Sequence, residues 1–232
     1  MKDFIENNFD LKKCVKSFLV LYLFFYRAIF NIIPVYLFNI DVNNISMKTL
    51  GYLNLYMGIA FLFVIGIVYF KDITNEFKIF IKKFWDNFDT GFKSWILGLA
   101  IMFISNLILI IIFRSGGANN ENAVQDLIKS CPIAMGFYSC LIAPFVEEVV
   151  FRKTIKDFIK NKWLFINVSF LFFGGAHVLS MAENLVDLLY IIPYGTLGAT
   201  FAYAYHKTDT VFTSTLFHII HNTSLFLLSI LV

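Results

Sequence analysis

Long apolar stretches alternate with short polar segments along most of the chain. Crossing a hydrocarbon core takes about 20 helical residues, and seven stretches are long enough. They lie near residues 17–39, 49–70, 94–114, 133–152, 163–181, 185–205 and 210–232. Because His218, His221 and Asn222 interrupt the last stretch, a re-entrant or partly buried helix is its alternative. The pattern predicts an all-α, polytopic membrane helix bundle with about seven transmembrane helices.

The composition excludes an ordinary soluble domain. Hydrophobic residues make up 59% of the chain and charged residues 15%. Lysines cluster before the first stretch, between the second and third, and between the fourth and fifth, and His206 with Lys207 lies between the sixth and seventh, whereas the alternate loops are poor in lysine. By the positive-inside rule, the N-terminus is cytoplasmic and the C-terminus lies outside. The net charge of +3 therefore reflects membrane topology, and the expected partner is membrane lipid, not nucleic acid.

We expect a single integral membrane domain over residues 1–232. Residues 1–131 hold the first three stretches, and residues 132–232 hold the last four together with almost all intramembrane polar residues. The segment 71–93 has an apolar face among lysines and aspartates, which favours an interfacial amphipathic helix on the cytoplasmic side. A plain soluble connector is the alternative.

Two adjacent carboxylates, Glu147 and Glu148, lie within the fourth stretch. Ionisable groups at membrane depth are expensive and mark functional sites by default. If the fourth and fifth helices turn at Asn161 and Lys162, Glu147 and His177 each lie 15 residues from residue 162. Both are then roughly 20 Å from the turn, at one level of the bundle. The seventh stretch adds a polar stripe that includes His218, His221 and Asn222.

The two glutamates differ in what they face. Glu148 and Arg152 are spaced i, i+4 on one helix face and can form an ion pair. Glu147 points about 100° away, so it is left to face His177 and His218. The alternative is a buried ion cluster that only fixes helix packing. His221 lies outside this scheme, and we expect it to satisfy a buried polar group instead of sharing in the chemistry.

Three short motifs resemble those of a known family. Glu147-Glu148-xxx-Arg152, Phe173-xxx-His177 and His218-xxx-Asn222 are similar to the EExxxR, FxxxH and HxxxN motifs of the CAAX-protease and bacteriocin-processing family. The resemblance covers about residues 133–232. It implies an intramembrane endopeptidase that cuts a peptide bond near the cytoplasmic side. In that family's pattern, Glu147 is the general base, His177 helps hold the attacking water, and His218 with Asn222 stabilises the oxyanion. Glu148 and Arg152 orient Glu147.

Family analogy also gives the expected substrate. The many Phe, Ile, Lys and Asn residues are typical of an AT-rich bacterial genome. The substrate class expected in bacteria is a small, membrane-associated secreted peptide, such as a quorum-sensing or bacteriocin precursor. A non-proteolytic membrane protein for bacteriocin self-immunity or scaffolding is the alternative function.

No cofactor is expected. The HExxH helix of soluble zinc peptidases is absent, and Cys14, Cys131 and Cys140 show no metal-ligand spacing. The alternative is a zinc ion held by Glu147, His177 and His218. Glutamate chemistry without metal is the preferred interpretation.

Overall fold

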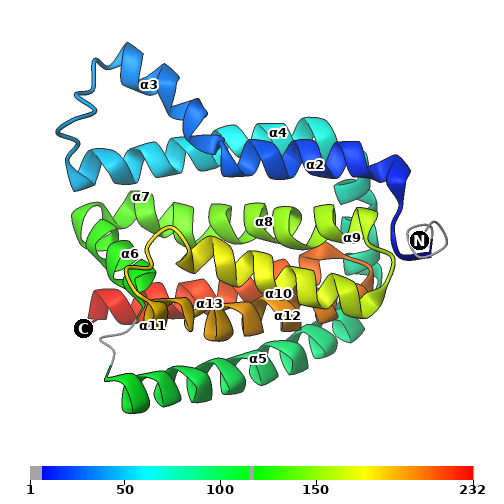
Figure 1. Ribbon diagram of the computed structural model, residues 1–232. Helices are drawn as coiled ribbons and strands as arrows, with labels where there is room; N and C mark the ends of the chain where they lie inside the picture. The colour runs from blue at the N-terminus through cyan, green and yellow to red at the C-terminus, as the bar shows by residue number, and fades with distance from the viewer. Residues whose placement is uncertain (1–6, 115–117, 232) are drawn as a thin grey trace.

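The computed structural model describes residues 7–114 and 118–231, and this part of the chain forms helices joined by short turns, without a β-sheet (Figure 1). The helices are α2 (Leu11–Phe25), η1 (Arg27–Asn31), α3 (Ile32–Leu37), α4 (Met47–Lys82), α5 (Phe84–Phe113), α6 (Asn119–Ser130), α7 (Pro132–Phe137), η2 (Tyr138–Ile142), α8 (Ala143–Glu148), η3 (Val149–Lys153), α9 (Thr154–Phe158), α10 (Lys162–Val178), α11 (Leu185–Leu188), α12 (Ile191–Thr208) and α13 (Val211–Leu231). The expected all-α bundle is confirmed.

The number of spanning helices is smaller than the seven expected. Among the described residues, five helices are long and apolar enough to cross a membrane, or six if the pair Lys13–Phe25 and Arg27–Leu37, bent by 57°, is one span. At the bend, the Arg27 Nη1 atom donates a hydrogen bond to the Phe24 carbonyl oxygen at 3.0 Å. The expected stretch 163–181 forms only the 17-residue helix α10, which ends at Val178. At 1.5 Å per residue, α10 is about 25 Å long, shorter than a typical hydrocarbon core.

The segment 71–93 is not one helix, contrary to expectation. Its first part continues α4, which runs for 36 residues, and its second part opens α5. The chain turns between them at Lys83, whose φ of −120° and ψ of 36° are not helical. No proline interrupts the chain between Met47 and Lys82, so nothing ends α4 at the expected boundary near residue 70.

The helix that carries the two glutamates contains two wider turns. Helical structure runs from Pro132 to Phe158, with the π-helical turns η2 and η3 on either side of α8. Pro144 has no backbone N–H, so the Cys140 carbonyl loses its α-helical partner within η2. Single π-turns inside α-helices occur frequently at functional sites.

Helices α10 and α12 pack closely because both carry glycines at their contact. A Cβ atom added to Gly174 would lie 2.6 Å from the Ile191 carbonyl oxygen, and one added to Gly198 would lie 2.9 Å from the Ser169 carbonyl oxygen. Small residues at such positions let two helix backbones approach. Helix α12 also packs along α5, so it lies in the interior of the bundle.

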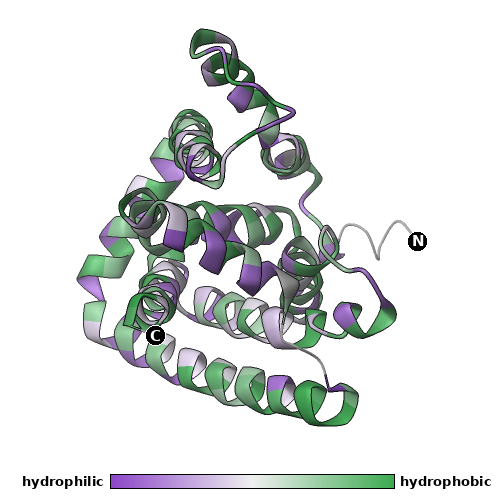
Figure 2. Ribbon diagram, turned by 90° about the vertical axis from the view of Figure 1, so that its left-hand side faces the viewer, coloured by the Kyte–Doolittle hydropathy of each residue, from purple (hydrophilic) through white to green (hydrophobic). Residues whose placement is uncertain are grey.

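The core of the bundle is aromatic and lies around the middle of α12. It includes Phe151, Phe173, Phe201 and Phe217, all buried. Large apolar side chains also cover much of the outer surface, and Ile67 is 85% exposed. Figure 2 shows hydrophobic residues along the full length of the helices. An apolar outer surface is what lipid requires.

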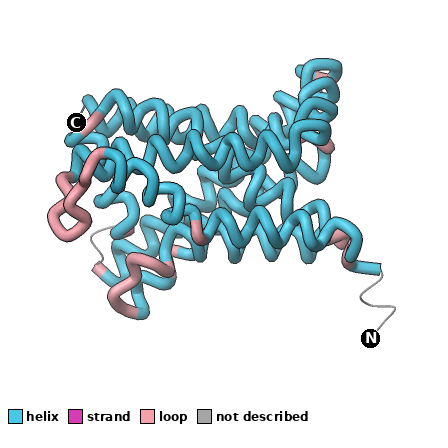
Figure 3. Tube along the Cα trace, turned by 90° about the horizontal axis from the view of Figure 1, so that it is seen from above, coloured by secondary structure: helices cyan, strands magenta, loops and turns pink. Residues whose placement is uncertain are grey.

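The bundle has two chemically different ends (Figure 1). At the end where α4 meets α5, α9 meets α10 and α12 meets α13, the turns carry lysines, including Lys82, Lys83, Lys160, Lys162 and Lys207; we call this the lysine-rich end. Helices α6 and α11 and the C-terminus lie at the opposite, lysine-poor end. Figure 3 shows that the longer loops gather there.

Candidate active site

Three helices bring Glu147, His177 and His218 together inside the bundle. The Glu147 Oε2 atom on α8 lies 3.8 Å from the His177 Nε2 atom on α10 and 3.7 Å from the His218 Nε2 atom on α13. The expected alignment of Glu147 with His177 across the antiparallel pair is therefore present. The Glu147 side chain keeps 18% of its surface exposed, whereas His218 keeps 4%.

Glu148 points the other way and lies in a fully buried network. Its Oε2 atom is 3.2 Å from the Arg152 Nε atom, and both side chains are 0% exposed. The expected i, i+4 pair is thus present. The Arg152 guanidinium also lies over the Phe173 ring, 4.4 Å from its centre, which adds a fully buried cation–π contact. The same Glu148 carboxylate contacts His218 Nδ1 at 2.9 Å through its Oε1 atom.

The contact between Glu148 and His218 was not anticipated from the sequence. The spacing of Glu148 and Arg152 explains that pair completely, so nothing local indicated a second partner for the carboxylate. The polar stripe on α13 was the available signal, because a polar stripe in lipid requires a polar partner.

In both His177 and His218, the Nδ1 atom lies within hydrogen-bond distance of an acceptor. His177 Nδ1 lies 2.8 Å from the Phe173 carbonyl oxygen, which only accepts, so Nδ1 carries the proton. His218 Nδ1 likewise faces the Glu148 carboxylate. Both Nε2 atoms then face Glu147. The FxxxH spacing explains part of this, because Phe173 supplies both the carbonyl and a ring 4.4 Å from the His177 ring. Tyr194 stacks on His177 with ring centres 5.0 Å apart.

The space between Glu147 and the two imidazoles suits a small bridging group. Distances of 3.7 and 3.8 Å exceed direct hydrogen-bond length, and a water about 2.8 Å from both atoms of a pair would bond to them at an angle of about 83°, narrower than the tetrahedral angle. Zinc bonds of about 2.0 to 2.1 Å place two ligands of a tetrahedral site about 3.3 Å apart, closer than the atoms here. Within the described ranges, no three His, Cys, Asp or Glu side chains form a group that could hold a metal ion.

Asn222 and His221 are placed differently from His218. Asn222 Nδ2 donates to the Ser139 carbonyl oxygen at 2.9 Å, in the π-turn η2. An amide has two N–H donors, so this bond leaves one for another acceptor. His221 is 7% exposed on α13, and within the described part of the chain it is not among the ion-pair partners of Glu147.

A second buried network, which the sequence did not predict, links α4 to α12 and α13 at the lysine-rich end. Glu76 on α4 accepts from the Val211 backbone N–H at 2.8 Å and from the Tyr205 hydroxyl at 3.0 Å, and lies 3.3 Å from Lys153 Nζ. Lys153 also pairs with Asp157 at 2.7 Å. Glu76 thus caps the start of α13, the helix that carries His218. An acid within the apolar face of segment 71–93 was the signal that could have revealed it.

The three cysteines are free, as expected. Cys131 and Cys140 are buried, and Cys14 is partly exposed. Burial raises the pKa of the Cys131 thiol above its usual value, which disfavours the reactive thiolate.

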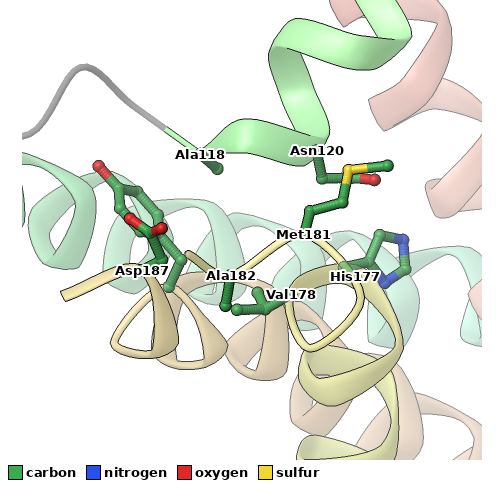
Figure 4. A pocket seen from close by; sticks show the side chains of 8 residues that line it. Ala118, Asn120, His177, Val178, Met181, Ala182 and Asp187 are labelled. Carbon is green, nitrogen blue, oxygen red and sulfur yellow. The ribbon is translucent and has the colours of Figure 1, made fainter. Parts of the chain in front are cut away.

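A pocket reaches His177 from the lysine-poor end (Figure 4). The cavity that it encloses is only about 10 Å³, scarcely room for one water molecule. The lining residues come from the start of α6, the end of α10 and the α11 region: Ala118, Asn120, His177, Val178, Met181, Ala182, Asp187 and Tyr190. Asn120 also contacts the Tyr194 hydroxyl at 3.4 Å, behind His177.

Comparison with known proteins gives a family match and a relative. Residues 129–224 match the family described as Type II CAAX prenyl endopeptidase Rce1-like. A protein of Bacillus subtilis (strain 168) named "Putative membrane peptidase YdiL" is 29% identical over 109 residues, which cover 46% of this chain and 41% of that protein. The match thus spans less than half of the relative's length. No solved structure shows a significant match to the chain. The residues that match the family include all three motifs.

Proposed function

We propose, from the membership of this chain in the CAAX-protease and bacteriocin-processing family, that it is an intramembrane endopeptidase. The observation that carries the proposal is the convergence of two imidazole Nε2 atoms on the partly exposed Glu147 carboxylate, at 3.7 and 3.8 Å. Water is a weak nucleophile, so peptide hydrolysis needs a base within reach of it. A carboxylate faced by two imidazoles, within a helix bundle, supports that chemistry.

In the proposed reaction, Glu147 takes a proton from a water held between it and His177. The water oxygen then forms a bond to the peptide carbonyl carbon, and the carbonyl oxygen becomes an oxyanion. When this tetrahedral intermediate collapses, the C–N bond breaks and Glu147 returns its proton to the leaving amine. Glu147 thus acts first as base and then as acid.

The second amide N–H of Asn222 and His218 are the proposed stabilisers of the oxyanion, and His218 can donate to it only when Nε2 carries a proton as well as Nδ1. Preorganised donors at this point are among the largest contributions to catalysis. Glu148 and Arg152 act as positioning residues. The 2.9 Å contact between Glu148 and His218 fixes the ring orientation of His218, and Arg152 balances the buried charge. Ser139 holds Asn222 through its carbonyl oxygen.

We propose that the reaction needs no metal. The glutamate route uses groups already in place, and their separation accommodates a water. In the alternative, Glu147, His177 and His218 hold zinc, which would supply a more acidic bound water. Purified protein should keep its activity after treatment with EDTA and 1,10-phenanthroline. Loss of activity that added zinc restores would favour the alternative.

The proposed substrate is a small secreted peptide precursor that associates with the membrane. The proposed setting is a multi-pass cell-membrane protein with a cytoplasmic N-terminus and an external C-terminus. The five or six apolar helices support the membrane setting, and the orientation rests on the lysine distribution.

The experiment that tests the proposal compares secreted peptides from cells that produce the wild-type chain, Glu147→Gln or Glu183→Gln. The matched control Glu183 is exposed on the loop after α10. We expect a precursor to accumulate with Glu147→Gln, measured by peptide mass spectrometry, and normal products with Glu183→Gln. Equal protein levels in the membrane fraction are required. If a cellular phenotype persists fully with Glu147→Gln and no peptide changes, the chain acts instead as a non-proteolytic immunity or scaffold protein.

A further inference from the structure

The start of α13 is held by two acceptors, one local and one from another helix. Thr210, directly before α13, accepts from the Phe212 N–H through its own hydroxyl at 3.3 Å. Because donor and acceptor are two residues apart, this bond can form wherever α13 lies. Glu76 of α4 instead accepts from the Val211 N–H at 2.8 Å, across 135 positions of the chain. The second bond, unlike the first, fixes where α13 begins relative to another helix.

The same Glu76 carboxylate reaches the helix that carries the two adjacent glutamates. It lies 3.3 Å from Lys153 Nζ, and the side chains of Lys153 and Glu76 are only 6% and 11% exposed. Lys153 is the last residue of η3, the π-turn that begins directly after Glu148. Its cation also lies over the Tyr69 ring of α4, 5.3 Å from the ring centre. One side chain of α4 therefore links η3 with the start of α13.

Aromatic packing joins α4, α8 and α13 at the same turn. The centre of the Phe212 ring lies 5.1 Å from that of the Phe77 ring on α4 and 6.0 Å from that of the Phe145 ring on α8. Phe77 follows Glu76 directly, and Phe145 comes two residues before Glu147. Packing and interhelical hydrogen bonds are what hold helices together in lipid, and both act here on the first turn of α13.

The rotation of α13 decides whether His218 meets its partners. Val211 and His218 are seven residues apart. This is close to two helical turns, so the two residues lie on one face of α13, about 10 Å apart along its axis. A change of register by one residue would turn that face by about 100°. His218 would then lose both the Glu148 contact at 2.9 Å and its position 3.7 Å from Glu147.

We propose that Glu76 is a positioning residue, which sets the rotation of α13 against α8 and so brings the His218 ring between Glu147 and Glu148. The proposal rests on the proposed function. Glu76 acts through Lys153 and the Val211 N–H and needs no contact with the substrate. It lies outside residues 129–224, the segment that matches the family. The N-terminal part of the chain then takes part in building the site.

The tautomer of the His218 ring tests the proposal without a substrate. NMR of the imidazole nitrogens, in protein labelled at its four histidines, distinguishes a proton on Nδ1 from one on Nε2. A His218→Gln variant assigns the His218 signal. The wild type should carry the proton on Nδ1, facing Glu148. Glu76→Met keeps the length of the side chain but removes the carboxylate, so a signal from the Nε2 tautomer should appear.

Two variants separate positioning from a general loss of stability. Glu76→Gln keeps an acceptor for the Val211 N–H and should restore the wild-type His218 signal. Asn87→Ala removes a buried bond to the Phe80 carbonyl oxygen at 3.2 Å, which joins α5 to the same end of α4, and should leave the His218 signal unchanged. If Glu76→Met does not accumulate, Lys153→Met breaks the other link and should shift the signal in the same direction.

Peptide mass spectrometry then asks whether this geometry matters for cleavage. A misplacement of about 1 Å can cost about a hundredfold in rate. At equal amounts of protein in the membrane fraction, the ratio of precursor to product should rise by about ten- to a hundredfold with Glu76→Met. The ratio should stay near that of the wild type with Glu76→Gln and with Asn87→Ala.

Three results would overturn the positioning role. They are a wild-type His218 signal in Glu76→Met and Lys153→Met, normal peptides with Glu76→Met, and an equal effect of Asn87→Ala. If even Glu147→Gln changes no peptide, the proposed function fails instead, and the His218 signal still decides whether Glu76 orients the ring.

Discussion

Removal of Arg152 should destabilise the protein more than removal of any surface charge. Arg152 and Glu148 are both 0% exposed, and their charged atoms lie 3.2 Å apart. In Arg152→Met, the Glu148 carboxylate stays buried without its guanidinium partner and keeps the His218 contact at 2.9 Å. Two unit charges at this separation attract by about 5 kcal/mol at an effective dielectric constant of about 20. The intact pair offsets the cost of its own burial, and the single variant loses that compensation.

The expected loss is about 3 to 5 kcal/mol of the free energy of unfolding. Because about 1.4 kcal/mol corresponds to a tenfold change in the equilibrium, the ratio of folded to unfolded protein should fall by two to three and a half orders of magnitude. Glu148→Gln should cost a similar amount, since it removes the negative charge nearest to the buried guanidinium. The double variant Glu148→Gln/Arg152→Met should cost much less than the sum of the single variants.

The exposed pair of Asp89 and Lys93 provides a matched control. It has the same i, i+4 spacing and an N–O distance of 2.6 Å, but its side chains are 59% and 73% exposed. Asp89→Asn should therefore cost only about 0.3 to 0.5 kcal/mol. The assay is SDS titration of each purified variant in mixed micelles, followed by circular dichroism. If Arg152→Met costs no more than Asp89→Asn, or if the single effects simply add, the reasoning from a buried pair is refuted.

Three further predictions use the same titration. Gly198→Ala should destabilise the protein by about 1 to 3 kcal/mol, because its Cβ atom would lie 2.9 Å from the Ser169 carbonyl oxygen. Gly66→Ala in α4 should instead stabilise it by about 0.5 to 1 kcal/mol, because its Cβ atom would meet nothing within 4 Å. Changes of the same sign in the free energy of unfolding for both variants would contradict the packing argument. Glu76→Ala should cost about 1 to 3 kcal/mol, because it leaves the buried Val211 N–H without its acceptor, and hydrogen exchange should rise first at the start of α13. Ser169→Ala should cost about 1 kcal/mol by removing the 3.0 Å bond to the Phe151 carbonyl oxygen in η3, and a neutral result would show that this bond adds nothing.

The helical pattern and part of the site could be predicted because they depend on regular spacing. Apolar runs identified the helices, and counting residues from the turn near Lys162 placed Glu147 level with His177. The i, i+4 rule found the pair of Glu148 and Arg152. In each case one helical repeat, known in advance, converts sequence distance into spatial distance.

The remaining features depend on contacts between distant segments. Which acceptor His218 Nδ1 meets depends on how α13 rotates against α8, and no local spacing determines that rotation. Glu76 contacts residues more than 120 positions away. The end of α10 at Val178 was also missed, because the apolar run continues beyond it to Leu179 while the helix does not. Hydropathy indicates which segments of a chain can lie in lipid, but it does not indicate the residue at which a helix ends.

The π-turn η2 restricts how the chain can change during evolution. Each π-turn holds one more residue than an α-turn of the same reach. Deleting one residue between Tyr138 and Ile142 would therefore let η2 relax to an ordinary α-turn that keeps the parts of the helix before and after it in nearly the same relative orientation. A further inserted residue that the turn does not absorb would rotate Glu147 by about 100° relative to α7. Glu147 would then leave His177 and His218, although every motif residue remained in the chain. Function should therefore tolerate a deletion in this interval better than an insertion.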